Sequence, residues 1–439
     1  MKNKIIDTYI INLRSRIERK EHILNEFKTR EEFAVNIVEA CEHKIGAVGL
    51  WNSIKKIIRE AERKELEYVL ICEDDHLFTS DYSKDILFER IAYSIDKNAD
   101  ILSGGVSWFE DALYIADGIF WVRKFSGAQF TIIFKKFYRI ILEATFEDTD
   151  AADYKMGTLT NNKFFIYPFI SVQQEFGYSD VTDKNNEPGH VVDLFKRSSA
   201  SALVVKSIRE RSKKSMVDMP YNDTFENITI PTYIINLPES RDRRRHIEQQ
   251  FEGRSEFDVK IIAAVKHEIG AVGLWLSIRN VIEMAVENDD DVIIICEDDH
   301  EFTMDYTKNA LLQNIITAHK QRIDYLSGGA GNFGLAIPVT TNSYWVNPCF
   351  STQFIVVYKS LFQKILNHPF DENVRADILL SNITFNKLIL YPYISTQKDF
   401  GHSYVTPIHN SSRDFVKNMF TNAANRLEAI KTAYLNYDQ

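Results

Sequence analysis

The fold of this chain is decided by YVLICEDDH at Tyr68–His76, where an apolar run ends in three carboxylates and a histidine. A continuous apolar run of this length is typical of a strand whose sheet is covered on both faces. Along such a strand Glu73 and Asp75 point to one side and Asp74 to the other. Ligands of α/β sheets bind at the carboxyl ends of the strands, so we expect a ligand at these acids.

The same stretch identifies an internal duplication, because ICEDDH recurs at Ile295–His300. A constant spacing of 224 residues also relates YIINL, IGAVGLW and LSGG, which begin at Tyr9, Ile45 and Leu102, to second copies downstream. A period this long indicates a repeated domain and not a solenoid. We predict domain 1 at residues 1–190, a helix and linker at 191–226, and domain 2 at 227–439, which ends in a further helix.

Strands and helices alternate within each copy, which predicts an α/β fold with a mostly parallel sheet flanked by helices. In copy one the predicted strands are Tyr9–Asn12, Tyr68–Cys72, Asp100–Leu102, Gln129–Phe134 and Phe164–Tyr167. The predicted helices are Arg14–Lys28 and Gly46–Lys64, whose apolar residues recur at helical spacing. Trp51, Trp275, Cys72 and Cys296 are interpreted as core residues.

Composition narrows the classes of protein. The chain has 439 residues, 45% of them hydrophobic, and a formal net charge of −10, so a disordered chain and a nucleic-acid binder are poor interpretations. No apolar stretch is long enough for a transmembrane helix, and the N-terminus does not resemble a signal peptide. The four cysteines lack CxxC spacing, which indicates a reducing compartment, so we expect a cytoplasmic protein. The sequence leaves a homo-oligomer open.

The strand-end carboxylates are candidate metal ligands. Mg²⁺ and Mn²⁺ prefer carboxylate oxygens and keep positions free for substrate phosphates. The competing interpretation is a solvated acidic turn, and the exact repetition of ICEDDH favours the metal. The candidate metal ligands are Glu73, Asp75, Glu297 and Asp299.

Arginines follow the first strand of each copy, where Arg19 and Arg243 are equivalent. A guanidinium group at a helix start suits a diphosphate, because it adds forked donors to the helix N–H groups. The alternative is a solvated helix face with intrahelical ion pairs. Two further hypotheses concern His76 and His300, which either bind a metal or phosphate or hydrogen-bond the neighbouring acids in a turn.

Later acids are candidates for general base catalysis. Asp153 and Asp377 are equivalent and begin a predicted helix, so each is either a base or a helix-capping acid. Asp180 follows Ser179 in QQEFGYSDVT, and the equivalent of Asp180 in copy two is Tyr404.

In order along the chain, these motifs resemble glycosyltransferase family 25, which includes lipooligosaccharide and collagen galactosyltransferases. The resemblance rests on an NL plus Arg-rich helix start, best seen as INLPESRDRR, on G-x-x-G before a helix, on EDD, and on YPFISVQQEFGYSDVT. It covers most of both copies. Two departures are Ser53-Ile54 and Ser277-Ile278, where the family has Ser-His, and Ser403-Tyr404, where copy one keeps Ser-Asp.

The resemblance implies two tandem GT-A-like domains, a UDP-sugar donor, Mn²⁺ or Mg²⁺ at EDD, and inversion at the anomeric carbon. It implies transfer of a hexose, galactose or glucose, to a hydroxyl of a glycan or protein acceptor. Donor-binding roles then fall on Asn12, Arg19, Gly46, Asp74, Asn236, Arg243, Gly270 and Asp298, and catalytic roles on Asp153, Asp377 and Asp180.

Three alternatives remain open. One copy is catalytic and the other only binds a sugar or nucleotide, or mediates dimerisation. The chain binds a UDP-sugar without turnover. The chain is a nucleotidyltransferase, although neither copy has the Gly-rich, Lys-containing N-terminal loop expected of that class.

Overall fold

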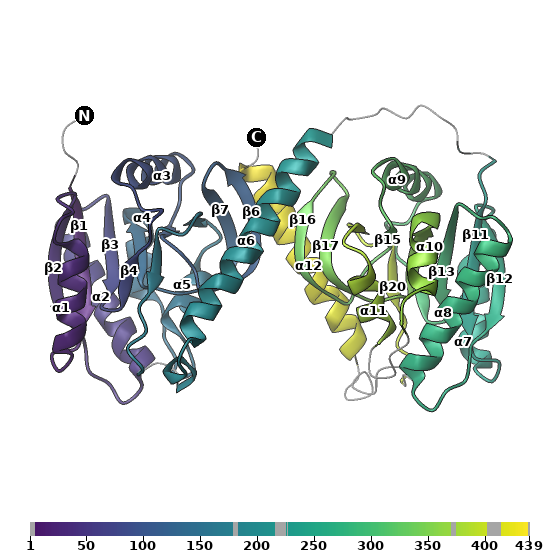
Figure 1. The fold of residues 1–439 in the computed structure, drawn as a ribbon, viewed down its shortest axis with the longest axis horizontal. Coiled ribbons are helices and arrows are strands. Elements are labelled where there is room, and N and C mark those ends of the chain that lie inside the picture. The colour runs from purple at the N-terminus through teal and green to yellow at the C-terminus, as the bar shows by residue number, and fades with distance from the viewer. Residues whose placement is uncertain are drawn as a thin grey trace. The chain divides into compact units, whose positions relative to one another are not determined.

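The computed structural model describes residues 5–178, 183–215, 225, 227–369, 375–401 and 414–437. The chain forms two compact units, one of Met1–Ser207 with Thr432–Gln439 (unit 1) and the other of Ile208–Lys431 (unit 2). Helices α6 (His190–Ser215) and α12 (Phe415–Tyr437) follow the α/β part of each copy, as the sequence predicts, and both contribute residues to the two units (Figure 1).

The described residues of unit 1 contain an eight-stranded sheet and a two-stranded one. The larger sheet contains β1 (Ile6–Asn12), β2 (Phe33–Glu39), β3 (Tyr68–Glu73), β5 (Ile101–Ser103), β6 (Trp108–Ala116), β7 (Ile119–Ser126), β8 (Phe130–Phe134) and β9 (Lys163–Ile166). The smaller one pairs β4 (His76–Phe78) with β10 (Ser171–Gln173). The helices are α1 (Ile17–Phe27), α2 (Gly46–Arg63), α3 (Lys84–Asp96), α4 (Lys135–Glu143) and α5 (Ala152–Leu159), with a 3₁₀ helix η1 at Asp183–Asn186.

The sheet order is β2-β1-β3-β8-β5-β9-β7-β6. The prediction of an α/β fold is confirmed, but the prediction of a mostly parallel sheet is wrong, because the sheet is mixed. Of the seven pairings between described strands, β1–β2, β1–β3 and β5–β9 are parallel and the other four are antiparallel. The antiparallel pairs come from β8 and from the β6–β7 hairpin, a segment in which the sequence analysis named no strand.

The parallel part of the sheet positions the acids. Strands β1 and β3 are neighbours, and Ile11 pairs with Glu73, so the polar residues that follow both strands share one edge. Helix α2 packs on β1, β2 and β3 and buries Trp51 and Ile58. The buried run Val69–Cys72 fills the interior of the sheet, which confirms the core interpretation of Cys72.

Unit 2 repeats this design within its described residues. Its larger sheet contains β11 (Ile230–Asn236), β12 (Phe257–Ala263), β13 (Val292–Glu297), β15 (Tyr325–Ser327), β16 (Asn332–Pro338), β17 (Ser343–Phe350), β18 (Phe354–Tyr358) and β19 (Lys387–Leu390), in the same relative order. The smaller sheet pairs β14 (His300–Phe302) with β20 (Ser395–Gln397). The helices are α7 (Arg241–Phe251), α8 (Gly270–Glu287), α9 (Lys308–Lys320), α10 (Lys359–Leu366) and α11 (Ala376–Ile383). The prediction that Trp275 and Cys296 are core residues is also confirmed, because both side chains are buried.

Candidate functional site

The central aspartate of each EDD turn is held by an asparagine and an arginine. In unit 2, Asn236 Nδ2 donates to Asp298 Oδ2 at 2.8 Å, and Arg243 Nη1 donates to Asp298 Oδ1 at 2.9 Å. All three side chains are buried. Unit 1 repeats this cluster through Asn12, Arg19 and Asp74, at 2.8 and 3.1 Å. The carboxyl ends of two neighbouring strands and the start of the intervening helix are therefore joined by charged hydrogen bonds.

The arginine extends toward the last acid of the turn. Arg243 Nη1 lies 3.2 Å from Asp299 Oδ2, and the guanidinium also lies 4.9 Å from the centre of the Phe400 ring. Burial acts to lower the pKa of Arg243, but the charges of Asp299 and Asp298 raise it above its ordinary value. Arg19 makes the equivalent contact with Asp75 at 3.4 Å. The alternative of a solvated helix face is therefore wrong for both arginines.

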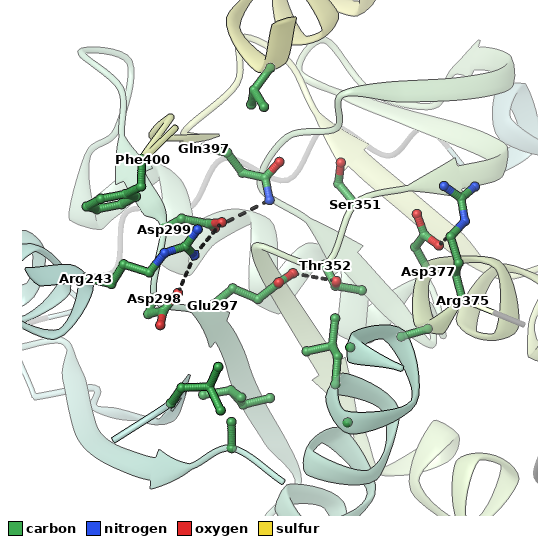
Figure 2. Close-up of a pocket in the computed structure, with 18 of the residues that line it drawn as sticks. Arg243, Glu297, Asp298, Asp299, Ser351, Thr352, Arg375, Asp377, Gln397 and Phe400 are labelled. Atoms are coloured by element: carbon green, nitrogen blue, oxygen red, sulfur yellow. Dashed lines mark hydrogen bonds and ion pairs between the residues drawn. The ribbon is translucent and has the colours of Figure 1, made fainter. Parts of the chain in front are cut away.

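Glu297 and Asp299 are desolvated acids near each other. Burial, followed by the charge of Asp299, raises the pKa of Glu297 from 4.5 to about 8. Burial also raises the pKa of Asp299 to about 6. Thr352 Oγ1 donates to Glu297 Oε1 at 2.6 Å, and Gln397 Nε2 lies 3.4 Å from Asp299 Oδ1 (Figure 2). Burial therefore outweighs the hydrogen-bond donors and the guanidinium near these carboxylates and raises the pH at which each ionises.

Unit 1 has the equivalent acids, Glu73 and Asp75, with one hydrogen-bond donor fewer around them. Burial raises the pKa of Asp75 to about 6 and that of Glu73 well above its ordinary value. Gln173 Nε2 lies 3.5 Å from Asp75 Oδ1, as its equivalent does in unit 2. The position of Thr352 is taken by Ala128, which has no hydroxyl to donate to Glu73.

A divalent cation would fit two desolvated carboxylates that repel each other, because it supplies the charge they lack. Among the described residues no group of three or more His, Cys, Asp or Glu side chains is arranged to hold a metal ion. Any Mg²⁺ or Mn²⁺ held by Glu297 and Asp299 would therefore take its remaining ligands from water and from a substrate, which is the usual behaviour of Mg²⁺ with phosphates.

A cavity of about 610 Å³ opens beside these acids in unit 2. It brings together six residues predicted from sequence: Arg243, Gly270, Glu297, Asp298, Asp299 and Asp377. Figure 2 shows Arg243, Asp298 and Asp299 on one side of the pocket and Asp377 with Arg375 on the other. The cavity is large enough for a nucleotide-sized ligand, since ligand pockets span about 300–1,000 Å³.

The candidate bases lie in the first turns of α5 and α11 and are not N-cap residues. In unit 1, Asp153 Oδ2 accepts a hydrogen bond from Gly127 N at 2.8 Å, which ties α5 to the loop before β8. In unit 2, Asp377 lies 3.8 Å from Arg375 Nε, and unit 1 has Ala151 in the place of this arginine. Asp180 and Tyr404 lie outside the described residues.

The two glycines of G-x-x-G have different surroundings. Gly46 and Gly270 begin helices α2 and α8, and Gly270 lines the cavity. A Cβ atom on Gly273 would lie 2.5 Å from the carbonyl oxygen of Val265, and one on Gly49 would meet the equivalent oxygen at 2.4 Å. The second glycine is therefore required by close packing of the helix against the preceding loop.

The hypothesis that the two histidines hydrogen-bond the neighbouring acids is wrong. His76 and His300 are fully buried, and each Nδ1 is hydrogen-bonded to a serine hydroxyl, of Ser171 or Ser395, at 2.8 Å. Burial holds the pKa of His300 well below its ordinary value. These residues join β4 to β10 and β14 to β20, and among the described residues neither imidazole is hydrogen-bonded to an acid of its EDD turn.

Sequence reasoning missed the residues that complete the pocket. Thr352, Gln397 and Arg375 were not proposed, although Gln397 belongs to a repeated segment and Gln173 is its equivalent. That repetition was the available signal for the glutamines. Thr352 and Arg375 had no such signal, because the equivalent positions in unit 1 are Ala128 and Ala151.

Comparison with known proteins identifies no family for this chain. No protein-family profile matches the chain. No curated protein matches it. Among solved structures, A197 from STIV is similar with a TM-score of 0.27 and 14% identity, over 40% of this chain and 87% of that one. UDP-glucose pyrophosphorylase is similar at the same TM-score, in its apo form (10% identity, 46% and 82% coverage) and with UDP-glucose bound (9%, 45% and 81%). Likenesses this low carry no argument about fold or function.

Among the described residues, no helix is both long enough and apolar enough to cross a bilayer.

Proposed function

We propose that each unit binds a nucleotide sugar at its EDD edge and that the chain is a UDP-hexose-dependent glycosyltransferase with GT-A-like domains. The observation that carries this proposal is the cavity of unit 2, in which a fixed guanidinium stands beside two acids of raised pKa. A diphosphate with its bound cation matches this pattern, because the arginine pairs with the phosphates and the cation neutralises the acids.

Under this proposal, different residues of each site bind different parts of the UDP-sugar donor. Glu297 and Asp299 would hold Mn²⁺ or Mg²⁺, which supplies charge neutralisation for a leaving diphosphate. Asn236 donates to Asp298, and Asp298 accepts from Arg243 and so holds its guanidinium at the same edge. Glu73, Asp75, Asn12, Asp74 and Arg19 repeat this assignment in unit 1.

Asp153 is the proposed general base for transfer in unit 1. The acceptor hydroxyl oxygen forms a bond to the anomeric carbon while the bond from that carbon to the diphosphate oxygen breaks. The hydroxyl proton moves to the carboxylate of Asp153, and UDP leaves with the bonding electron pair. Attack on the face opposite the leaving group inverts the anomeric centre.

A second candidate function has one specific observation in its favour. Asp377 has Arg375 as a neighbour, where Asp153 has Ala151 nearby. A positive charge stabilises a carboxylate and makes it a weaker proton acceptor. Unit 2 would then bind donor or acceptor while unit 1 carries out most of the transfer.

The test uses the full chain with UDP-galactose, UDP-glucose and UDP-N-acetylglucosamine, each with and without Mn²⁺. We expect calorimetry to show binding of UDP that is strengthened by Mn²⁺, and at least one UDP-sugar to release UDP slowly by hydrolysis. Binding without any UDP release, even with a panel of saccharide acceptors, would support a binding protein instead. Absence of UDP binding with and without Mn²⁺ would refute the proposal.

A further inference from the structure

Unit 1 carries an exposed aromatic pair next to its candidate base. The rings of Trp108 and Tyr154 are stacked, with centroids 5.7 Å apart and planes 16° from parallel. Trp108 is 39% exposed and Tyr154 is 41% exposed. The other four tryptophans of the chain, at positions 51, 121, 275 and 345, are at most 4% exposed. Trp108 therefore differs from every other tryptophan in being held at the surface.

The position of this pair relates it to the site. Tyr154 directly follows Asp153 in α5, and Trp108 is the first residue of β6. The unit 2 equivalent of Trp108 is Asn332, which lines the cavity together with Asp377. By this equivalence the aromatic pair stands at the site, next to the candidate base.

Both residues of the pair keep exposed surface. Stacked aromatic rings lose little conformational freedom when a flat partner is added, and their exposed apolar faces favour such a partner. The saturated ring of a pyranose presents one face of C–H bonds that suits this surface, and it needs no counter-charge. The nearby cation Lys155 is already paired with Asp150 at 2.8 Å, so it offers no free charge to an anionic ligand.

The equivalent edge of unit 2 has different residues. Asn332 and Ile378 replace Trp108 and Tyr154, and the aromatic residue there, Phe350, stands on the neighbouring strand in place of Ser126. Arg375 adds a positive charge in place of Ala151. The two units thus share their EDD edge and differ at the opposite edge.

We propose that the Trp108–Tyr154 pair is a stacking platform for an uncharged pyranose ring of the acceptor in unit 1. This inference rests on the proposed function, since it names the acceptor class for that site. It assigns to unit 1 a neutral sugar acceptor that unit 2 does not bind in the same way.

Intrinsic fluorescence of the full chain tests the platform, because the one exposed tryptophan is part of it. The probes are methyl β-galactoside, methyl β-glucoside and lactose, titrated with UDP and Mn²⁺ present. We expect at least one probe to shift the emission and to protect it from acrylamide quenching. Tyr154→Ala keeps Trp108 as reporter and should weaken that probe about tenfold, the effect of losing about 1.4 kcal/mol of stacking. Ile378→Ala, the matched change in unit 2, should leave the titration unchanged.

The outcomes separate this inference from the proposed function. If UDP binds but neither the free saccharides nor UDP-glucose affect Trp108 emission, or if Tyr154→Ala binds as tightly as the parent chain, the platform is refuted and the nucleotide site stands. If the free saccharides have no effect and UDP-glucose protects Trp108 where UDP does not, the platform holds the donor hexose and the acceptor assignment is wrong. If UDP itself does not bind, the proposed function fails first. As a calorimetric check, Trp108→Phe should retain binding better than Trp108→Ala, and equal loss in both would contradict stacking.

Discussion

Asn236 Nδ2 donates to Asp298 Oδ2 at 2.8 Å and so joins the end of β11 to the turn after β13. The same bond, at the same length, joins Asn12 to Asp74 in unit 1. Because Asp298 also accepts from Arg243, its carboxylate is committed to protein partners. The acids on either side of it, Glu297 and Asp299, have protein partners of their own and also line the cavity.

The first prediction concerns the asparagine that donates to this carboxylate. Asn236→Ala removes a donor from a buried carboxylate and should cost about 1–3 kcal/mol of stability in unit 2. It should also weaken UDP binding, because Arg243 loses its fixed partner. Asn12→Ala should have the same effect in unit 1. Scanning calorimetry of the full chain measures both, and an unchanged profile for either variant would show that the asparagine contributes nothing to the turn.

The second prediction concerns the division of labour between the units. Asp75→Asn should lower sugar transfer about 100-fold or more, since Asn keeps the shape of Asp75 and loses its charge. Asp299→Asn should lower it less, because Asp377 has an arginine neighbour and Tyr404 replaces Asp180. The matched controls are the exposed residues Asp81 and Asp305, whose Asn variants should transfer normally. Equal losses in Asp75→Asn and Asp299→Asn would favour two active units instead.

The third prediction concerns pH. The folded chain raises the pKa of Glu297 from 4.5 to about 8, so between these values the folded state binds more protons than the unfolded state. Stability should therefore fall as pH rises from about 4.5 to about 8, and become independent of this group above that range. Glu297→Gln mimics the protonated acid and removes the effect.

The measurement compares the melting temperatures of the parent chain and Glu297→Gln in EDTA across this range. We expect the parent to lose stability relative to the variant by about 1 kcal/mol for each pH unit. Mn²⁺ at pH 8 should restore the parent and not the variant. A difference between the two that does not change with pH would mean that Glu297 is ionised in the folded chain throughout.

The fourth prediction concerns the G-x-x-G turns. Gly273→Ala places a Cβ atom 2.5 Å from the carbonyl oxygen of Val265, and Gly49→Ala creates the equivalent clash. Each should destabilise its unit by about 1–3 kcal/mol, the usual cost of overpacking. Gly157→Ala, in helix α5, is the control, since the nearest atom outside that helix's backbone, on the Phe125 ring, would be 3.9 Å from the new Cβ atom. It should be neutral or stabilising, because alanine favours a helix over glycine. Denaturant titration distinguishes the three variants.

Sequence alone determined the repeat, the α/β class and the main strands. The buried run before EDD predicts a strand, and β3 ends at Glu73, one residue beyond the predicted end at Cys72. Helix α2 begins at the predicted Gly46 and ends one residue before the predicted end. These elements could be predicted because burial on both sheet faces, or on one helix face, leaves a local pattern of apolar residues. The carboxylates could be predicted for the same reason, since they interrupt that pattern twice.

Tertiary structure alone decided the mixed sheet and the surroundings of each polar group. The direction of β8 between β3 and β5 depends on pairing across long separations, which no local pattern records. The sequence could not distinguish an arginine on a solvated helix from Arg243, since only the fold brings Asp298 within 2.9 Å of it. Nor could it show that His300 is enclosed and that Asp377 faces the pocket of Asp299 from the far side (Figure 2). The chemistry of an ionisable group is set by its neighbours and its burial, and those are properties of the folded chain.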